Sequence, residues 1–229
     1  MSDDERIERA GLLYERFVFG GDASVLSAAD RELDAVEADL ALARGRIIHG
    51  RFLDQRSKDS EQIAEDPHEL ALFERALQLY ENAGDVGGEA ESLFWVGCFH
   101  QLVRRDNATA VPVLERSCEL AAQVGDKRTM SDALRHLGIA AHAAGRLDAA
   151  RQWLEESVRL RREIGLMPGV AANLVGLIYI AAGQGRPDDA LALAAEAGAI
   201  AEASGADAIM RQVEEAREQI AGSDPPLPL

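Results

Sequence analysis

The sequence predicts an all-α fold, an α-solenoid of stacked helix–turn–helix units with capping helices. Gly84, Gly125, Gly165 and Gly205 recur 41, 40 and 40 residues apart, and each ends a similar amphipathic block. Ala, Leu, Glu and Arg dominate these blocks, whereas β-branched residues are sparse, which favours helix throughout. A fixed period of this length indicates supersecondary units that each pack mainly on their neighbours.

The third unit shows the pattern most clearly. A first helix is expected over Asp132–Ala144, followed by a turn at Gly145–Asp148 in which Asp148 serves as an N-cap. A second helix then covers Ala149–Ile164, and Gly165 ends it. Its predicted inner face carries Ala150, Trp153, Leu154, Ser157 and Val158.

Two further hairpins and a cap complete the array. The second hairpin is predicted from about Gly88 to Val124, and the fourth from about Gly169 to Ser204, where Pro187 suits a first helical turn. A last helix near Ala206–Ala221 caps the stack, with Ile209, Val213 and Ile220 facing inward.

The N-terminal third is less regular. One helix is expected over Asp3–Phe19, and a long helix or a helix pair over Ser24–Gly50. A polar insertion follows at residues 51–65, for which disorder is favoured over a lid or binding loop. Asp66 and Pro67 then open the next helix as cap and first residue. The organisation is therefore irregular N-terminal helices (1–66), a repeat array with its cap (67–221), and a mobile Pro-rich tail (222–229).

Charge and composition narrow the class of partner. The formal net charge is −16, which disfavours binding to nucleic acid and to anionic membrane surfaces. No apolar run approaches the roughly 20 residues of a membrane helix, and no secretion signal opens the chain. These features predict a cytoplasmic protein. Only Lys58 and Lys127 are lysines among 24 basic residues, which favours a bacterial source.

Three units share a set of small and apolar positions that identifies the repeat. The third has Leu137-Gly138, Ala144-Gly145-Arg146-Leu147-Asp148, Ala150, Leu154 and Ser157; the second has Val96-Gly97, Ala110, Leu114 and Ser117; the fourth has Val175-Gly176, Ala190, Leu193 or Ala194, and Ala197. This pattern resembles the tetratricopeptide repeat family over residues 68–205. The period of about 40 exceeds the family's usual 34, as in variant arrays of large bacterial transcription regulators and kinesin light chains. The resemblance implies a right-handed solenoid that binds peptides or proteins on a concave face.

In such arrays the first helix of each unit lines the concave face. The resemblance therefore places eleven residues in a binding groove: Glu91, Phe94, Cys98, Gln101, Asp132, Arg135, Ile139, His142, Asn173, Leu177 and Ile180. Such a surface suits an extended or helical segment with apolar anchors, and the acidic chain favours basic partners. The alternative is that Phe94, Ile139 and Leu177 pack against neighbouring helices. Arg135 and Asn173 lie where some family members clamp a carboxylate, but the usual Lys is missing.

A basic cluster in the third unit has two interpretations. Arg146, Arg151, Arg159, Arg161 and Arg162 provide an acidic-partner site in one. In the favoured one, Arg159–Arg162 are solvated cations in the last turn of a helix.

No pattern for catalysis or for a cofactor is found. His136 and His142 are six residues apart on one helix and no third ligand completes a metal site. Cys98 and Cys118 are expected to be unpaired thiols. Nucleophile elbows, phosphate loops and dinucleotide fingerprints are missing from the sequence.

The leading interpretation is a non-enzymatic scaffold or regulatory interaction module. A small-molecule sensor, enclosed by the groove and the 51–65 insertion, is the alternative; an accessory enzyme subunit and self-association through exposed repeat ends also remain open.

Overall fold

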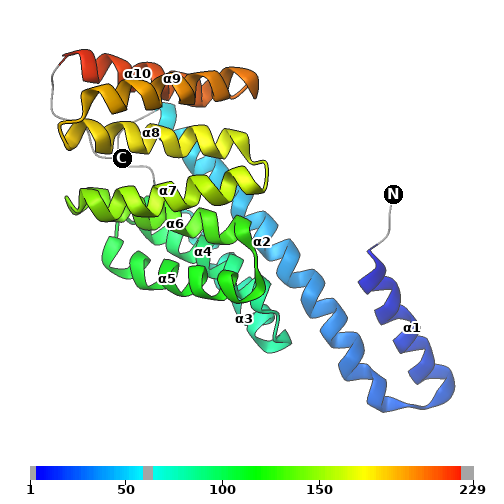
Figure 1. Ribbon diagram of the computed structural model, residues 1–229. Helices are drawn as coiled ribbons and strands as arrows, with labels where there is room; N and C mark the ends of the chain where they lie inside the picture. The colour runs from blue at the N-terminus through cyan, green and yellow to red at the C-terminus, as the bar shows by residue number, and fades with distance from the viewer. Residues whose placement is uncertain (1–3, 59–63, 223–229) are drawn as a thin grey trace. The chain divides into compact units, whose positions relative to one another are not determined.

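A computed structural model describes residues 4–58 and 64–222 of the chain, and within these ranges it is all helix, with no strand (Figure 1). This confirms the predicted all-α class. The chain divides into two compact units, Met1–Asp106 and Asn107–Leu229, and each is described by itself. The boundary predicted at residue 66 lies between two helices of the first unit.

The described residues of the first unit form four α-helices and one short 3-10 helix: α1 (Glu5–Gly20), η1 (Ala23–Val25), α2 (Leu26–Lys58), α3 (Pro67–Ala83) and α4 (Val86–Leu102). Asp4 caps α1 by accepting a hydrogen bond from the Arg6 amide, and the helix ends at Gly21 with φ 73°. Asp66 and Pro67 open α3 as cap and first residue. The predicted N-terminal helix and the start of α3 are thereby confirmed.

The second helix of this unit is longer than the sequence indicates. It is one continuous helix through Lys58, so residues 51–58 are helical and the expectation of a disordered insertion is wrong for them. This stretch has no Gly or Pro to stop a helix, and its Arg56 places a positive charge in the last described turn, where the helix dipole favours it. The remainder of the insertion, residues 59–63, lies outside the described residues.

The second unit is a succession of antiparallel helices: α5 (Asn107–Val124), α6 (Lys127–Ala143), α7 (Leu147–Glu163), α8 (Met167–Gly183), α9 (Pro187–Ala203) and α10 (Asp207–Gly222). Each packs on the next, and α10 contacts both α9 and α8. Val213 of α10 is buried, and Ile209 and Ile220 pack against the same core, as predicted for a cap. The predicted tail beyond Gly222 lies outside the described residues.

Left-handed residues set the period of the second unit. Gly125, Gly145, Gly165, Gly185 and Gly205 all have φ between 64° and 72°, which side chains other than glycine rarely adopt. They are 20 residues apart, so one helix with its turn occupies 20 residues and a pair occupies 40. The periodicity seen in the sequence is therefore a series of obligatory turn conformations.

Small residues bring α6 and α7 into close contact, as expected from the repeat pattern. A Cβ atom built on Gly138 would lie 2.9 Å from Cγ of Leu154 and 3.4 Å from the carbonyl oxygen of Ala150. Ala150 is completely buried beside it, and Ser157, about two turns further along α7, is also completely buried. The crossing depends on the missing side chain of Gly138.

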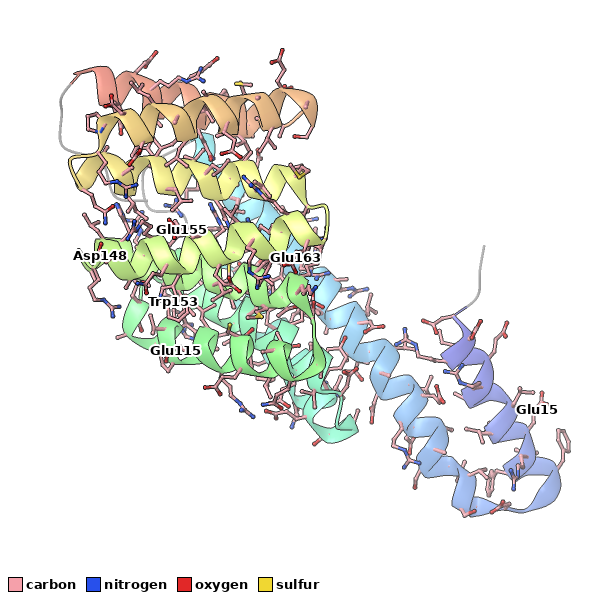
Figure 2. All side chains as sticks on the ribbon, viewed as in Figure 1. Glu15, Glu115, Asp148, Trp153, Glu155 and Glu163 are labelled. Carbon is pink, nitrogen blue, oxygen red and sulfur yellow. The ribbon has the colours of Figure 1, made fainter. Side chains whose placement is uncertain are left out.

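Two details of the α6–α7 hairpin, the third repeat predicted from the sequence, differ from expectation. Asp148 is not the N-cap of α7; Arg146 occupies that position without a side-chain cap, and the Asp148 carboxylate accepts a hydrogen bond from Gln184 Nε2 at 2.8 Å. Trp153 is 40 % exposed rather than on the inner face (Figure 2). It precedes the buried Leu154 by one residue, which rotates it by about 100° around the helix.

Candidate binding surface

The predicted groove residues of the second unit divide into an accessible stripe and a buried set. Asp132, Arg135, Ile139 and His142 follow one another at three- and four-residue intervals, so they share one face of α6, and each is half-buried. This stripe offers opposite charges, an apolar side chain and an imidazole along about 15 Å of helix. It is the accessible part of the predicted groove in this unit.

The predicted groove residues of α8 lie deeper. Asn173, Leu177 and Ile180 are all buried. Leu177 and Ile180 form part of a hollow of about 280 Å³ whose other walls come from α7 and α9. They therefore face the second helices of the repeats, in agreement with the packing alternative for Leu177.

In the first unit, three of the four predicted groove residues are buried. Phe94, Cys98 and Gln101 are covered, and the Phe94 ring contacts Trp95 edge-to-face with centroids 5.0 Å apart. Glu91 is half-buried and forms an ion pair with Arg46. Whether any of the eleven residues contacts a ligand stays a prediction.

A buried arginine organises the polar interior of the second unit. Arg161 of α7 donates to the Asp132 carboxylate at 2.6 Å, to Asn173 Oδ1 at 2.9 Å and to the Gly169 carbonyl at 2.8 Å. Burial lowers the pKa of the guanidinium, and the neighbouring Asp132 opposes that shift. The favoured interpretation of Arg159–Arg162 as solvated cations is thus wrong for Arg161, because its side chain bridges α6 and α8.

The network extends through neighbouring side chains to the accessible stripe. Asn173 Nδ2 donates to Ser157 Oγ at 2.7 Å, and Ser157 Oγ donates to the Ser131 carbonyl at 2.5 Å. Arg135 adds hydrogen bonds to Asn173 Oδ1 and to the Ala172 carbonyl, both at 2.9 Å. Two residues of the stripe, Asp132 and Arg135, are therefore held in place by buried partners, which lowers the entropy that a ligand would have to overcome.

Sequence reasoning missed a second buried polar cluster, in the first unit. His49 of α2 donates through Nδ1 to Glu69 of α3 at 2.7 Å, and Cys98 Sγ of α4 lies 3.7 Å from His49 Nε2. The His49 ring also meets Trp95 edge-to-face, with centroids 5.6 Å apart. The only available signal was a polar residue among apolar neighbours in each of three helices.

In this cluster a thiol, Cys98, lies next to an imidazole, His49, and a carboxylate, Glu69, orients the imidazole. All three side chains are buried, so a substrate has no approach to the Cys98 sulfur. The arrangement satisfies a buried histidine and a buried carboxylate by pairing them, and it ties α2, α3 and α4 together.

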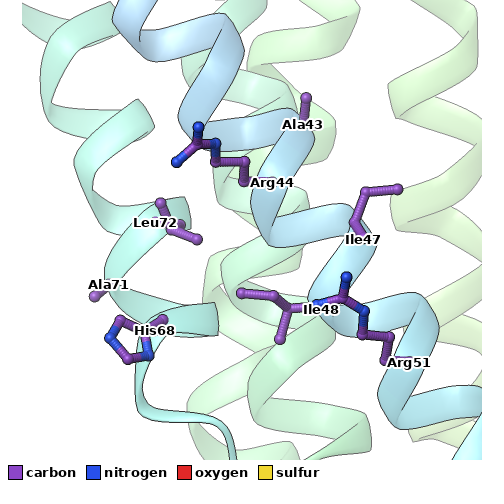
Figure 3. A pocket seen from close by; sticks show the side chains of 8 residues that line it. All are labelled: Ala43, Arg44, Ile47, Ile48, Arg51, His68, Ala71 and Leu72. Atoms are coloured by element: carbon purple, nitrogen blue, oxygen red, sulfur yellow. The ribbon is translucent and has the colours of Figure 1, made fainter.

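An open hollow of about 570 Å³ lies between α2 and α3 (Figure 3). Ile48 from α2 and Leu72 from α3 point toward one another across it, and His68 lies at its edge. Arg44 and Arg51 project from α2 at its rim. The hollow combines an apolar floor with two cationic side chains.

The protonation state of His142 affects the charge of the α6 stripe. Burial lowers the pKa of His142, which favours the neutral imidazole at the end of the α6 stripe.

Over the described parts of the chain no His, Cys, Asp and Glu side chains gather in a group of three that could hold a metal ion. Cys98 and Cys118 form no disulfide. Within residues 4–58 and 64–222 no helix combines the length and apolar character that crossing a membrane requires.

Comparison with known proteins bears on the second unit. The family model described as tetratricopeptide repeat matches residues 131–164, which cover most of α6 and all of α7. Comparison with curated proteins gave no match. The matched pair contains the close crossing at Gly138, the left-handed turn at Gly145 and the accessible stripe of α6. This match identifies residues 131–164 as a tetratricopeptide repeat, and the helices packed in succession within each unit are consistent with a helical solenoid of that type.

Proposed function

We propose that this protein is a non-catalytic scaffold of a bacterial cytoplasm, and that it binds a peptide or protein segment along the α6 stripe. Tetratricopeptide repeats mediate protein–protein interaction in general, and the matched repeat contains this stripe. The observation that carries the proposal is the half-burial of Asp132, Arg135, Ile139 and His142 on one face, above a fully satisfied polar network. Arg-rich composition and unpaired cysteines support the source and compartment.

The chemistry of the stripe suggests the kind of segment it binds. Ile139 supplies an apolar contact at the centre, and Asp132 and Arg135 supply charges of opposite sign on one side of it. The net charge of −16 attracts basic segments over long range and raises their association rate. A basic segment with one or two apolar anchors fits these features best.

The test is a comparison of two Ile or Leu to Glu substitutions. Ile139→Glu introduces a charge at the centre of the stripe, whereas Leu191→Glu does the same at an exposed position of α9. We expect a partner that co-purifies with the wild type to be lost with Ile139→Glu and kept with Leu191→Glu, with both variants folded by circular dichroism. Retention of every partner by folded Ile139→Glu would refute the proposal.

A second candidate function, small-molecule sensing, is favoured by the hollow between α2 and α3. Its volume falls within the range of ligand pockets, and Arg44 and Arg51 would suit a ligand with an apolar body and a carboxylate. A thermal-shift screen of fatty and aromatic acids distinguishes the two functions, because a bound ligand raises the melting temperature by mass action. A shift that disappears in Arg51→Ala would favour the sensor.

A further inference from the structure

A row of large apolar side chains lies uncovered along α2. Leu33, Leu40 and Ile47 are spaced by seven residues and are 46 %, 50 % and 60 % exposed. They lie on one side of the helix over about 21 Å. Buried residues of α2 such as Ala38, Ala41 and Leu42 lie elsewhere around the helix, so this row is not part of the core of the unit.

Small residues accompany the row in a regular way. Val36, Ala43 and Gly50 follow Leu33, Leu40 and Ile47 by three residues each, so the pattern alternates three and four residues. This is the seven-residue repeat of a helix that packs lengthwise against another helix, with large side chains of one entering spaces on the other. The pattern thus indicates a helical partner.

The first helix widens the same face. Ala10 of α1 is buried and Leu13 and Phe17 are half-buried, which indicates that this face packs on α2; Arg9 of α1 also pairs with Glu32 of α2. Ile7, Tyr14 and Val18 lie about 90° further around α1 and are exposed. Glu32 and Asp39, which pair with Arg9 and Arg6, mark the side of α2 that faces α1, and Leu33 and Leu40 follow them by one residue, about 100° further around the helix in the same sense. Because the two helices run antiparallel, both rows face the same side of the hairpin.

Charges beside the row change sign halfway along the helix. Asp30, Glu37, Arg44 and Arg51 are also spaced by seven residues and flank the apolar row on one side. The first two are acidic and the last two are basic. Arg44 and Arg51 form no ion pair within the described part of the chain, and Glu37 accepts a hydrogen bond from the exposed Arg75.

We propose that this face binds a second copy of the same chain, with the two α2 helices antiparallel about a two-fold axis near Ala41. This arrangement places Asp30 against Arg51 of the partner subunit and Glu37 against Arg44 of the partner subunit, and symmetry repeats each pair. In a parallel arrangement these four positions would lie on opposite flanks of the two helices and would form no pairs with one another. The sequence of signs is therefore complementary to itself in one orientation only.

The antiparallel arrangement also matches large side chains with small ones. Leu33 meets Gly50 of the partner subunit, Leu40 meets the partner's Ala43, and Ile47 meets the partner's Val36. The partner's Leu33 and Glu37 then lie against the hollow between α2 and α3, whose rim carries Arg44 and Arg51. One occupant accounts for the apolar row, the charge pattern and the hollow.

The state of association tests the interface directly. Sedimentation of the full chain, whose mass is 24.7 kDa, is expected to show a species of twice that mass at micromolar concentration. Leu40→Glu lies beside the axis and is expected to give a folded monomer, because the charge enters the interface twice. Leu191→Glu, at a site 53 % exposed on α9, is the matched control and is expected to remain a dimer. A wild-type monomer, or a dimer unaffected by Leu40→Glu, would overturn the proposal.

Reversing the charges of Glu37 and Arg44 tests whether the two α2 helices are antiparallel. Glu37→Arg and Arg44→Glu should each raise the dissociation constant roughly tenfold, because each replaces two attractive pairs with repulsive ones. The double variant restores opposite charges in the antiparallel arrangement and should recover the wild-type constant. Arg31→Glu, exposed on another side of α2, serves as the control for charge reversal and should have no effect. If the double variant dissociates as readily as the single ones, the antiparallel pairing is wrong. The proposed interface uses residues of the first unit and Ile139 belongs to the second, so Ile139→Glu should leave the dimer intact.

Discussion

Arg161 is expected to be the polar side chain whose loss most destabilises the second unit. Its replacement by Met keeps an unbranched, apolar side chain in the space between α6 and α8 but removes the guanidinium. Asp132 and Asn173 each lose a donor, and the Gly169 carbonyl loses its side-chain partner. Arg161 itself is only 5 % exposed, so no water takes its place around the inner partners.

The expected loss of stability in Arg161→Met is larger than that in Arg162→Met, because only Arg161 is buried. Removal of one member of a buried ion pair costs about 3–5 kcal/mol, because the other charge stays buried without a partner. Asp132 retains some access to solvent, with 23 % of its side chain exposed, so we expect the lower end, about 3 kcal/mol. Arg162 pairs with Glu196 at the surface, where both side chains are nearly half exposed. Arg162→Met should therefore cost less than about 1 kcal/mol.

Because the chain has two units, the unfolding of the second unit must be measured by itself. The chain has two tryptophans, Trp95 in the first unit and Trp153 in the second. In a Trp95→Phe background, urea unfolding followed by fluorescence reports on the second unit. If Arg161→Met and Arg162→Met then lose equal stability within about 0.5 kcal/mol, the buried network does not stabilise the fold in the way argued above.

Three further predictions concern packing, turns and protonation. Gly138→Leu should cost about 1–3 kcal/mol by the same fluorescence measurement, because even a Cβ there lies 2.9 Å from Leu154; a variant that melts like the wild type would contradict the crossing. Arg105 adopts φ 56° at a turn where the following turns have glycine, so Arg105→Gly should be neutral or stabilising by about 0.5 kcal/mol in urea unfolding, whereas Gly145→Ala should lose about 1 kcal/mol. The pKa of His142 is lowered by burial from its ordinary 6.5, so the unfolded chain binds the proton more readily. Stability of the second unit should fall as the pH drops below about 6.5, and His142→Gln should reduce that fall; an identical pH profile would argue against a buried neutral imidazole.

Local signals in the sequence were sufficient for helices and turns. The glycine period marks residues that need positive φ, and Asp66-Pro67 marks a helix start, because cap and turn chemistry depends on a few adjacent residues. These local signals fail where two neighbouring residues could each begin the same helix. Asp148 is a good capping residue, yet the three-residue turn after Ala143 starts α7 two residues earlier and leaves Asp148 inside the first turn.

Long-range partners explain the remaining differences. Arg161 looks like any cation in the last turn of a helix, and its burial depends on Asp132 and Asn173, 29 and 12 residues away. The groove positions were assigned from the repeat pattern alone, which does not distinguish the half-buried Ile139 from the buried Leu177. The length of α2 depends on the absence of a stop signal at Arg51, and polar composition alone suggested a loop there.

The two buried polar clusters have the same relation to the helices around them. His49, Glu69 and Cys98 come from α2, α3 and α4, whereas Asp132, Arg161 and Asn173 come from α6, α7 and α8. Helices rich in Ala and Leu present similar surfaces one turn apart, so apolar packing alone discriminates weakly against a shift of about 5.4 Å along the axis. A hydrogen-bonded set that spans three consecutive helices is satisfied in one register only, because a shift would leave a buried charge without its partner. We therefore infer that these clusters determine how the helices of each unit align. On that account, replacing the Asp132, Arg161 and Asn173 set with apolar residues of similar size should preserve helix content but broaden the unfolding transition of the second unit.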